Sequence, residues 1–572
     1  MIEFLVANFA PIMFCGLIVF LLMGYSLAFS LGACGLFFGW LAVWAGVPGM
    51  ESLLNALPLR IIGILKNDTL LAIPFFTFMG LILERSGMAE DLLETIGQVF
   101  GAVRGGLVFA VIFVGSLLAA TTGVVAASVI SMGLISLPIM LRYGYDRGLA
   151  SGAIVASGTL AQIVPPSLVL IVIADQVGRS VGDLYRGALF PALMLIGLYI
   201  IWIVIVTLIK PKAAPALPVE ARIFRDEKGH SGYTSLWILI AVSTLAAILY
   251  AKTQLSGQSL DNVVVLSMAI GIGIGIAFGL ALLNRALGFL TQGRISLLSK
   301  MAQQVTFVLI PPLALIFLVL GTIFLGWATP TEGGAMGAVG ALVLALARRR
   351  LGLEQLKQAM ESTMKLSSFV LFILIGATVF SLSFQGVDGP EWIHGMFSMI
   401  PGGVIGFLIF VNILVFILGF FLDFFEISFI VIPLLMPVAA ALNIDLVWLG
   451  VMLAMNLQAS FLTPPVGFSL FYYRSVAPVK AYLDRVTRKE IAPVATTEIY
   501  RGVIPFIVIQ VIMIGMIIAF PQLVTGNLDK KVDVDLNTIE INVPSGYGTG
   551  SYSNEPPKTE EDPMMKSLKE NN

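Results

Sequence analysis

Long apolar segments recur along the chain from Phe9 to Phe520, with only short polar interruptions. A helix that crosses a membrane needs about 20 predominantly apolar residues. The pattern predicts twelve such spans, at 5–23, 27–46, 69–85, 148–176, 188–210, 235–251, 263–283, 304–326, 331–347, 366–384, 446–476 and 500–520. Two further apolar stretches, 105–141 and 402–442, are too long for one straight span and contain no long polar segment. We expect each to form a re-entrant hairpin, whose irregular backbone is tolerated where protein or a wet cavity covers it.

Composition supports a location in the membrane. Of the 572 residues, 58% are hydrophobic and 12% are charged, and the mean hydropathy is +0.97. These values lie far outside those of soluble globular domains, so we predict an all-α polytopic membrane protein. The net charge of −1 gives no indication of a nucleic-acid partner. Cys15 and Cys34 lie in apolar spans, where we expect packing and not a disulfide.

Basic residues are unevenly divided between the two sides of the membrane. When successive loops are assigned to alternate sides, most of the 33 Lys and Arg residues fall on one side, including the run 348–350. The positive-inside rule makes that side cytoplasmic and places both termini in the periplasm. We place no Lys or Arg in the membrane interior, so an anionic substrate would be held by backbone dipoles and neutral side chains. The polar tail, 525–572, has too little apolar surface to fold alone, and we expect it to be disordered.

A weak internal repeat relates the two halves of the chain. The segments SGTLAQIVPPS (157–167) and NLQASFLTPPVG (456–467) each place a Pro-Pro pair inside an apolar span. Three pairs of residues share one offset of 299 positions: Pro138 with Pro437, Asp146 with Asp445, and Pro165 with Pro464. Each half then consists of three spans, a hairpin, a broken span and a final span, with 235–283 as an inserted helix pair. Five spans precede the insertion, so the second copy is expected to be inverted, as in many secondary transporters with a site at the membrane midplane.

The Pro-Pro pairs explain how a broken span could bind ions. Proline removes a backbone donor and disfavours helical geometry in the residue before it, which frees carbonyl groups for a cation. The half-helix that follows presents its positive N-terminal dipole to an anion. The alternative is a simple proline kink, which is common in membrane helices.

Each hairpin tip carries polar residues with two possible roles. The first tip, 119–123, has small residues and two hydroxyl groups, suited to cation contact or to close helix packing. The second has Asp423 and Glu426 three positions apart; intramembrane acids are usually functional, although Asp is also a preferred helix N-cap. Asp146 and Asp445 lie in turns, where we expect helix caps. The expected substrate-binding residues are the polar groups at the tips and breaks: Thr121, Thr122, Gln162, Ser167, Asp423, Glu426, Asn456 and Gln458.

The paired Pro-Pro segments, with GYDRGLASG before one and FLDFFEISFIVIPLLMPVA before the other, resemble the large membrane subunit of tripartite ATP-independent periplasmic (TRAP) transporters. The resemblance extends over nearly the whole chain except 235–283 and the tail. It implies a Na⁺-coupled importer of the elevator type in the bacterial inner membrane, which is not an enzyme and needs no cofactor beyond its coupling ion. It also implies two partners, a separate small membrane subunit and a periplasmic binding protein that delivers an organic anion.

The same resemblance implies two Na⁺ sites, formed mostly by main-chain carbonyls. The first would take its ligands from the first tip and first break: Ala119, Thr122, Ala161, Val164 and Pro166. The second would take them from the second tip and second break: Gly419, Ser460, Thr463 and Val466. The chain has Ala161 and Ser460 where the family generally has glycine, and Ala119 where serine is common. Carbonyl ligation survives these changes, although left-handed backbone would cost more without glycine.

The elements and the resemblance together predict the organisation of the chain. The expected parts are first-repeat scaffold (1–104), hairpin 1 with its broken helix as transport domain (105–187), a scaffold helix with cytoplasmic loop and inserted pair (188–303), second-repeat scaffold (304–401), hairpin 2 with its broken helix (402–480), a cytoplasmic loop and last span (481–524), and the tail (525–572). A stand-alone sodium/dicarboxylate symporter is the main alternative function. A membrane enzyme or respiratory subunit would need intramembrane His or Cys clusters, and the predicted spans contain no His.

Overall fold

The computed structural model describes residues 6, 8–222, 232–255, 262–290, 297–484, 486–526 and 528. These residues belong to the unit Met1–Leu528, and a second unit comprises Asp529–Asn572. The predicted disordered tail, 525–572, therefore lies almost entirely outside the described residues. The start of the predicted span 5–23 also lies outside them.

The described elements are nearly all helical. In chain order they are α2 (Phe9–Leu22), α3 (Leu27–Trp44), α4 (Met50–Asn55), α5 (Leu57–Leu65), η1 (Asp68–Leu71), α6 (Ala72–Arg85), α7 (Met88–Phe100), α8 (Gly106–Thr122), α9 (Val125–Arg142), α10 (Arg147–Thr159), η2 (Leu160–Gln162), α11 (Leu168–Val177), α12 (Val181–Ile209), η3 (Pro211–Ala213), η4 (Val219–Ala221), α13 (Tyr233–Tyr250), η5 (Ala251–Leu255), α14 (Asn262–Leu290), α15 (Lys300–Phe324), α16 (Pro330–Ala347), α17 (Leu353–Gly386), α18 (Gly389–Ser398), α19 (Gly403–Leu418), α20 (Phe424–Ala441), α21 (Leu446–Leu462), α22 (Phe468–Val476), β1 (Tyr482–Leu483), β2 (Glu490–Ile491), α23 (Thr496–Ala519) and α24 (Gln522–Thr525). The two short strands pair in antiparallel orientation, Tyr482 opposite Ile491.

The protein is a helical polytopic membrane protein. Ten described helices are long and apolar enough to cross a membrane, or eleven if the bent pair Met50–Leu65 and Asp68–Arg85, with an angle of 46°, counts as one span. This number differs from the predicted twelve because the spans expected at 5–23, 148–176 and 446–476 consist of shorter helices, and the span expected at 69–85 passes only as part of the bent pair. In contrast α9 and α20, which were expected as hairpin arms, are long enough to pass the length test.

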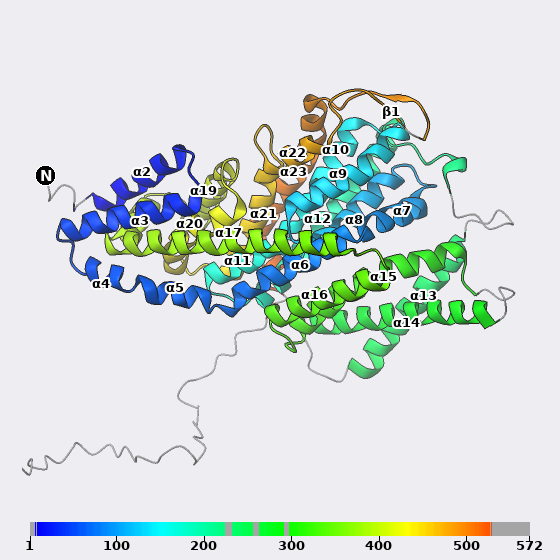
Figure 1. The fold of residues 1–572 in the computed structure, drawn as a ribbon, viewed down its shortest axis with the longest axis horizontal. Helices are drawn as coiled ribbons and strands as arrows, with labels where there is room; N and C mark the ends of the chain where they lie inside the picture. Colours follow the sequence, from blue (N-terminus) through cyan, green and yellow to red (C-terminus); the bar gives the residue numbers. More distant parts are fainter. Residues whose placement is uncertain are drawn as a thin grey trace, which may run out of the picture. The chain divides into compact units, whose positions relative to one another are not determined.

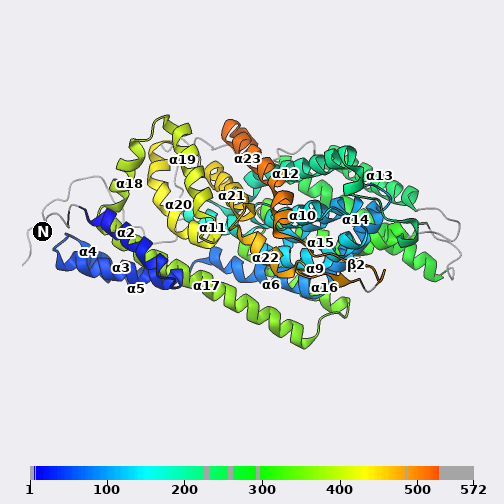
Figure 2. The same ribbon diagram turned by 90° about the horizontal axis from the view of Figure 1, so that it is seen from above.

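The broken spans form the centre of the described unit. Every residue of α10 from Leu149 to Thr159 is buried, and so is every residue of α21 from Val447 to Leu462. A helix that is apolar on all sides is stable only when protein or lipid surrounds it completely. The hairpin α8–α9 and the hairpin α19–α20 lie on opposite sides of these central helices (Figure 1 and Figure 2). The first break is also buried from Pro165 to Ser167, whereas the second is more open: Pro465 is exposed, and Thr463 and Val466 are half-buried.

Candidate functional site

Two broken helices carry the candidate site; they begin at the predicted offset of 299 positions, and their ends differ from it by one residue. Helix α10 continues into η2 before the break, and α21 ends at Leu462. The peptide bonds Pro165–Pro166 and Pro464–Pro465 lie in the two breaks, and both are cis. The side chain of Asp146 accepts a hydrogen bond from the Leu149 amide, and Asp445 accepts two at the start of α21. The predicted capping role of these two aspartates is confirmed.

Serine and tyrosine hydroxyl groups bind carbonyls within both breaks. Ser167 Oγ donates to the Gln162 carbonyl at 2.7 Å, and Ser469 Oγ donates to the Phe461 carbonyl, which is 299 positions after that of Gln162. Two tyrosines from the helices that follow donate to further break carbonyls. Tyr185 bonds to the carbonyl of Ser167 at 3.4 Å, and Tyr500 bonds to that of Pro465 at 3.2 Å.

Sequence analysis missed this pair of tyrosines. They lie in the matching segments LYRG (184–187) and IYRG (499–502), which are 315 positions apart. The offset exceeds 299 because the loop between α22 and α23, which contains β1 and β2, is longer than the loop between α11 and α12. A search that allowed one gap after the broken helix would have found the repeat.

The tip of hairpin 1 lies against the first break. Helix α8 packs on η2, and a methyl group built on Gly123 would lie 3.0 Å from the Leu168 side chain. The Thr122 hydroxyl bonds to the Leu118 carbonyl and to Ser128 Oγ, at 2.9 and 2.7 Å, and Thr121 also bonds to Leu118. The predicted ligands of the first Na⁺ site therefore lie on segments in contact: Ala119, Thr122, Ala161, Val164 and Pro166.

Hairpin 2 approaches the second break in a similar way. A methyl group built on Gly419 would lie 2.1 Å from Ser460 Oγ, so the tip and the break are in close contact. The Ser460 hydroxyl donates to the Leu457 carbonyl and the Thr463 hydroxyl to the Ala459 carbonyl, both at 2.8 Å. The structure thus brings together Gly419, Ser460 and Thr463, and Val466 follows on the same break.

Asp423 and Glu426 form a capping box at the start of α20. The Asp423 side chain accepts a hydrogen bond from the Phe424 amide at 2.7 Å, and the Glu426 carboxylate accepts one from the Asp423 amide at 2.9 Å. Reciprocal bonds of this kind satisfy backbone donors that would otherwise have no partner at the first turn. The geometry favours the capping interpretation, and substrate contact by these two acids stays a prediction.

Three amide side chains expected to bind substrate are buried. Asn456 donates to the Asn412 carbonyl of hairpin 2 at 2.7 Å, and Gln458 contacts Thr159 Oγ1 at 3.4 Å. Both amide atoms of Gln162 have no hydrogen-bond partner within the described part of the chain, although Gln162 is fully buried. A buried amide without partners costs free energy unless a ligand or water satisfies it. Gln162 therefore has the strongest physical case for ligand contact.

Contacts between the two halves are reciprocal. Methyl groups built on Gly187 of α12 and Gly502 of α23 would lie 3.0 Å from Val447 Cγ1 and 1.9 Å from the Gly148 carbonyl oxygen, respectively. Gly148 and Val447 are 299 positions apart, so each final helix packs on the broken helix of the other half. Likewise α11 packs on α20, and α22 packs on α9. Thr159, which contacts Gln458, is itself 299 positions before it.

A membrane protein in which two broken helices each face a hairpin tip has the features of a transporter. Residues 14–245 and 242–523 match the model of the family "Tripartite ATP-independent periplasmic transporter, DctM component". The chain belongs to this family, which confirms the resemblance seen in the sequence. It is a TRAP transporter large permease and not an enzyme.

Individual proteins are similar over most of the chain. The C4-dicarboxylate TRAP transporter large permease protein DctM of Pseudomonas aeruginosa is 26% identical over 423 residues, covering 74% of this chain and 81% of that protein. The ectoine/5-hydroxyectoine TRAP transporter large permease protein UehC of Ruegeria pomeroyi is 23% identical over 516 residues, covering 90% and 97%. Among solved structures, that of the Alcanivorax borkumensis YdaH transporter aligns with a TM-score of 0.48 and 13% identity, covering 83% of this chain and 89% of that one.

Proposed function

We propose that this permease imports a small organic anion by Na⁺-coupled secondary transport, with a periplasmic binding protein delivering the substrate. One observation carries the proposal: each hairpin tip touches the break of a central helix, Gly123 beside Leu168 and Gly419 beside Ser460. In secondary transporters, unwound carbonyls at such breaks coordinate Na⁺, and half-helix N-termini face anionic groups of the substrate. Belonging to the TRAP family supports the same assignment.

Two Na⁺ ions would bind at the two tip–break contacts. The proposed ligands are the carbonyl and hydroxyl oxygens of the residues named for each site above. The hydroxyl of Thr122 comes from hairpin 1, whereas that of Thr463 comes from the second broken helix. These neutral oxygens would replace the hydration shell of the ion, so the sites would need no carboxylate.

The substrate would bind between the two breaks. The partner-free amide of Gln162 is a hydrogen-bond donor and acceptor for a carboxylate, and the N-termini of α11 and α22 add positive dipoles. The names of the relatives differ in substrate, C4-dicarboxylate for one and ectoine for another. We therefore propose a small carboxylate class and no particular compound.

The two halves would form an inverted repeat that moves as an elevator. Helix α23 supports the inversion. Gly148 near the start of α10 lies beside Glu498 and Gly502 in the first two turns of α23, whereas Trp448 near the start of α21 bonds to the Ile517 carbonyl at the other end of α23. Twenty-four helical residues extend about 36 Å, so the two broken helices begin at opposite ends of one membrane-length helix. Reciprocal packing of the two halves is the pattern that a two-fold axis produces. The hairpins and broken helices would move together against the remaining spans.

The proposed assembly comprises this chain, the small membrane subunit and the binding protein, in the inner membrane with both termini periplasmic. The test is uptake into proteoliposomes containing both membrane subunits. We expect uptake only with the binding protein present and an inward Na⁺ gradient. Uptake without the binding protein would instead support a stand-alone sodium/dicarboxylate symporter. Uptake that is unchanged when K⁺ replaces Na⁺ would contradict Na⁺ coupling.

A further inference from the structure

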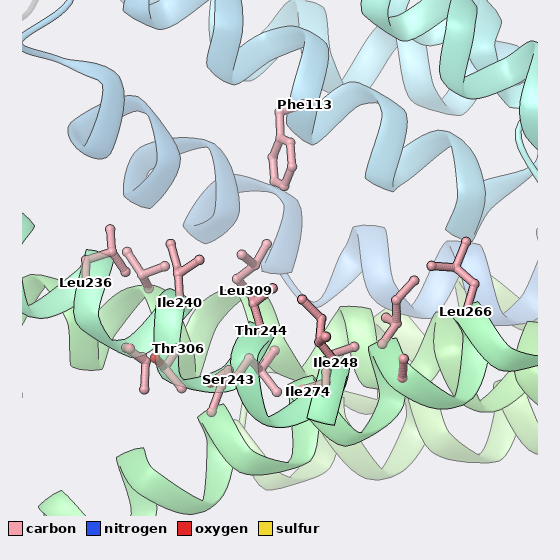
Figure 3. A pocket seen from close by; sticks show the side chains of 18 of the residues that line it. Phe113, Leu236, Ile240, Ser243, Thr244, Ile248, Leu266, Ile274, Thr306 and Leu309 are labelled. Carbon is pink, nitrogen blue, oxygen red and sulfur yellow. The ribbon is translucent and has the colours of Figure 1, made fainter. Parts of the chain in front are cut away.

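An apolar crevice lies beside the inserted helix pair. Its volume is about 960 Å³, and its walls come from α7, α8, α13, α14 and α15 (Figure 3). Aliphatic side chains such as Leu236, Ile240 and Ile274 form most of the lining. Phe113 reaches from α8 of hairpin 1 toward the side chains of α13 and α15. The cavity thus separates the inserted pair from a hairpin proposed to move.

The cavity is elongated along the membrane-spanning direction of α13. Its lining runs from Leu236 to Lys252, which is about 24 Å of helix, against a hydrocarbon core about 30 Å thick. Helices α13, α14 and α15 are all long and apolar enough to span the membrane. Because most of the lining is apolar, an apolar molecule is a more suitable occupant than water.

The charge at one end of the cavity favours a phospholipid as its occupant. The apolar lining continues along about 24 Å of helix and ends at the cationic side chain of Lys252. A phospholipid has the matching order, an acyl chain next to an anionic phosphate.

We propose that this crevice binds an acyl chain of a membrane phospholipid, with the lipid phosphate beside Lys252. Lys252 is exposed in η5 at one end of the crevice, where its cationic side chain can reach the membrane interface. The chain would fill the space between the inserted pair and hairpin 1 and keep Phe113 in an apolar environment. The inserted pair is then a lipid-binding element of the permease.

Two matched double variants of the full-length chain test the crevice. Ile240→Trp/Ile274→Trp places bulk in the lining, whereas Ile238→Trp/Leu283→Trp places the same bulk on exposed positions of α13 and α14 outside it. Each protein is exchanged into nanodiscs of equimolar phosphatidylglycerol and phosphatidylethanolamine, re-extracted in mild detergent and examined by native mass spectrometry. We expect wild type and the control to retain one more phospholipid than the crevice variant.

A second variant tests the headgroup without changing the packing. Lys252→Gln should retain the lipid but lose severalfold in its preference for phosphatidylglycerol over phosphatidylethanolamine. Equal lipid retention in the two tryptophan variants would overturn the proposal. The proposal would also be overturned if Ile240→Cys bound no lipid and cross-linked to the small subunit in the assembled complex. A helix of that partner would then occupy the crevice.

Discussion

The two helical hairpins occupy equivalent places in the chain but differ in how their tips are stabilised. Their second arms, α9 and α20, match end to end at the 299-residue offset. At the N-cap of α9, Val124 makes no side-chain cap, whereas its counterpart Asp423 forms a capping box with Glu426. The first tip is buried, while Phe421 at the second is 69% exposed. The conformation of the first tip is therefore stabilised by the residues packed around it, whereas that of the second is stabilised more by its own capping hydrogen bonds.

The far ends of the hairpins differ in the same way. Arg142, at the end of α9, forms an ion pair at 3.0 Å with Asp484 in the loop between α22 and α23. The equivalent residue of α20 is Ala441, which cannot form such a pair. Hairpin 1 is thus held by neighbouring parts of the chain at its far end as well as at its tip. Substitutions in the residues that contact a hairpin should therefore destabilise hairpin 1 more than hairpin 2.

The largest effect is expected for Gly80→Ala. A methyl group there would lie 2.5 Å from Thr122 Cα, so the backbone of the first tip would have to shift. Overpacking of this kind costs about 1–3 kcal/mol, and we expect a lower melting temperature and loss of most uptake. Gly63→Ala is the control, because a methyl group at Gly63 meets no atom within 4 Å.

Gly419→Ala tests the effect of an added methyl group at the second tip. Its methyl group would lie 2.1 Å from Ser460 Oγ and 2.7 Å from Ser460 Cβ, so removal of that one side chain makes room for it. We expect a smaller loss than for Gly80→Ala, and recovery of uptake in Gly419→Ala/Ser460→Gly. A double variant as inactive as Gly80→Ala would show that the two tips tolerate change equally.

The next largest effect is expected from breaking the Arg142–Asp484 pair. Burial alone would raise the pKa of Asp484, but hydrogen bonds from Thr487 and Arg142 and the charge of Arg142 outweigh it and lower the pKa to about 2. Loss of a hydrogen bond to a charged group costs about 1.5–3 kcal/mol, so Asp484→Asn should lower the melting temperature. Glu361→Gln, which removes half of an exposed ion pair with Lys365, should change it little.

The pH dependence of this effect has a definite sign. A carboxyl group whose pKa is lowered on folding stabilises the protein fully above its ordinary pKa, near 4, and loses that stabilisation as the pH falls toward 2. The difference in melting temperature between wild type and Asp484→Asn should therefore stay constant from pH 7 to pH 5 and shrink below about pH 4. A difference that disappears between pH 7 and pH 5 would rule out this ion pair as its source.

A smaller effect is expected from conservative changes at the capping box of hairpin 2. Serine is also a good N-cap and glutamine can complete a capping box, so Asp423→Ser and Glu426→Gln should retain near-wild-type stability and uptake. Asp423→Ala should cost about 1 kcal/mol in thermal unfolding. If Asp423→Ser and Glu426→Gln are stable but transport poorly, the carboxylates contact substrate or ion, as the sequence first indicated.

Much of this arrangement is readable from the sequence, because local residue chemistry determines it. Proline pairs mark both breaks, and Asp146 and Asp445 mark the helix starts that they cap. Short helices such as α4, α5, α7 and α18 were missed because they are too short to resemble spans. The Tyr185 and Tyr500 contacts were missed because the loop after α22 shifts the repeat. The reciprocal packing of the two halves depends on tertiary structure, which no local pattern encodes.

An effect confined to Na⁺ affinity is expected from Thr463→Ala, which tests how the two proposed Na⁺ sites differ. Thr463 supplies a hydroxyl from the second break, but its counterpart, Val164, has none, so a hydroxyl for the first site must come from Thr122 of hairpin 1. Loss of one such contact costs about 0.5–1.5 kcal/mol, which is about a twofold to tenfold weaker affinity for Na⁺. Two concentrations for half-maximal uptake are compared, that of Na⁺ and that of substrate-loaded binding protein. Thr463→Ala should therefore raise the first more than the second. Thr363→Ala removes the same kind of hydroxyl-to-carbonyl bond in α17 and should leave both unchanged. An unaltered Na⁺ dependence in Thr463→Ala would exclude its hydroxyl as a ligand, and the second site would then depend on carbonyl groups alone.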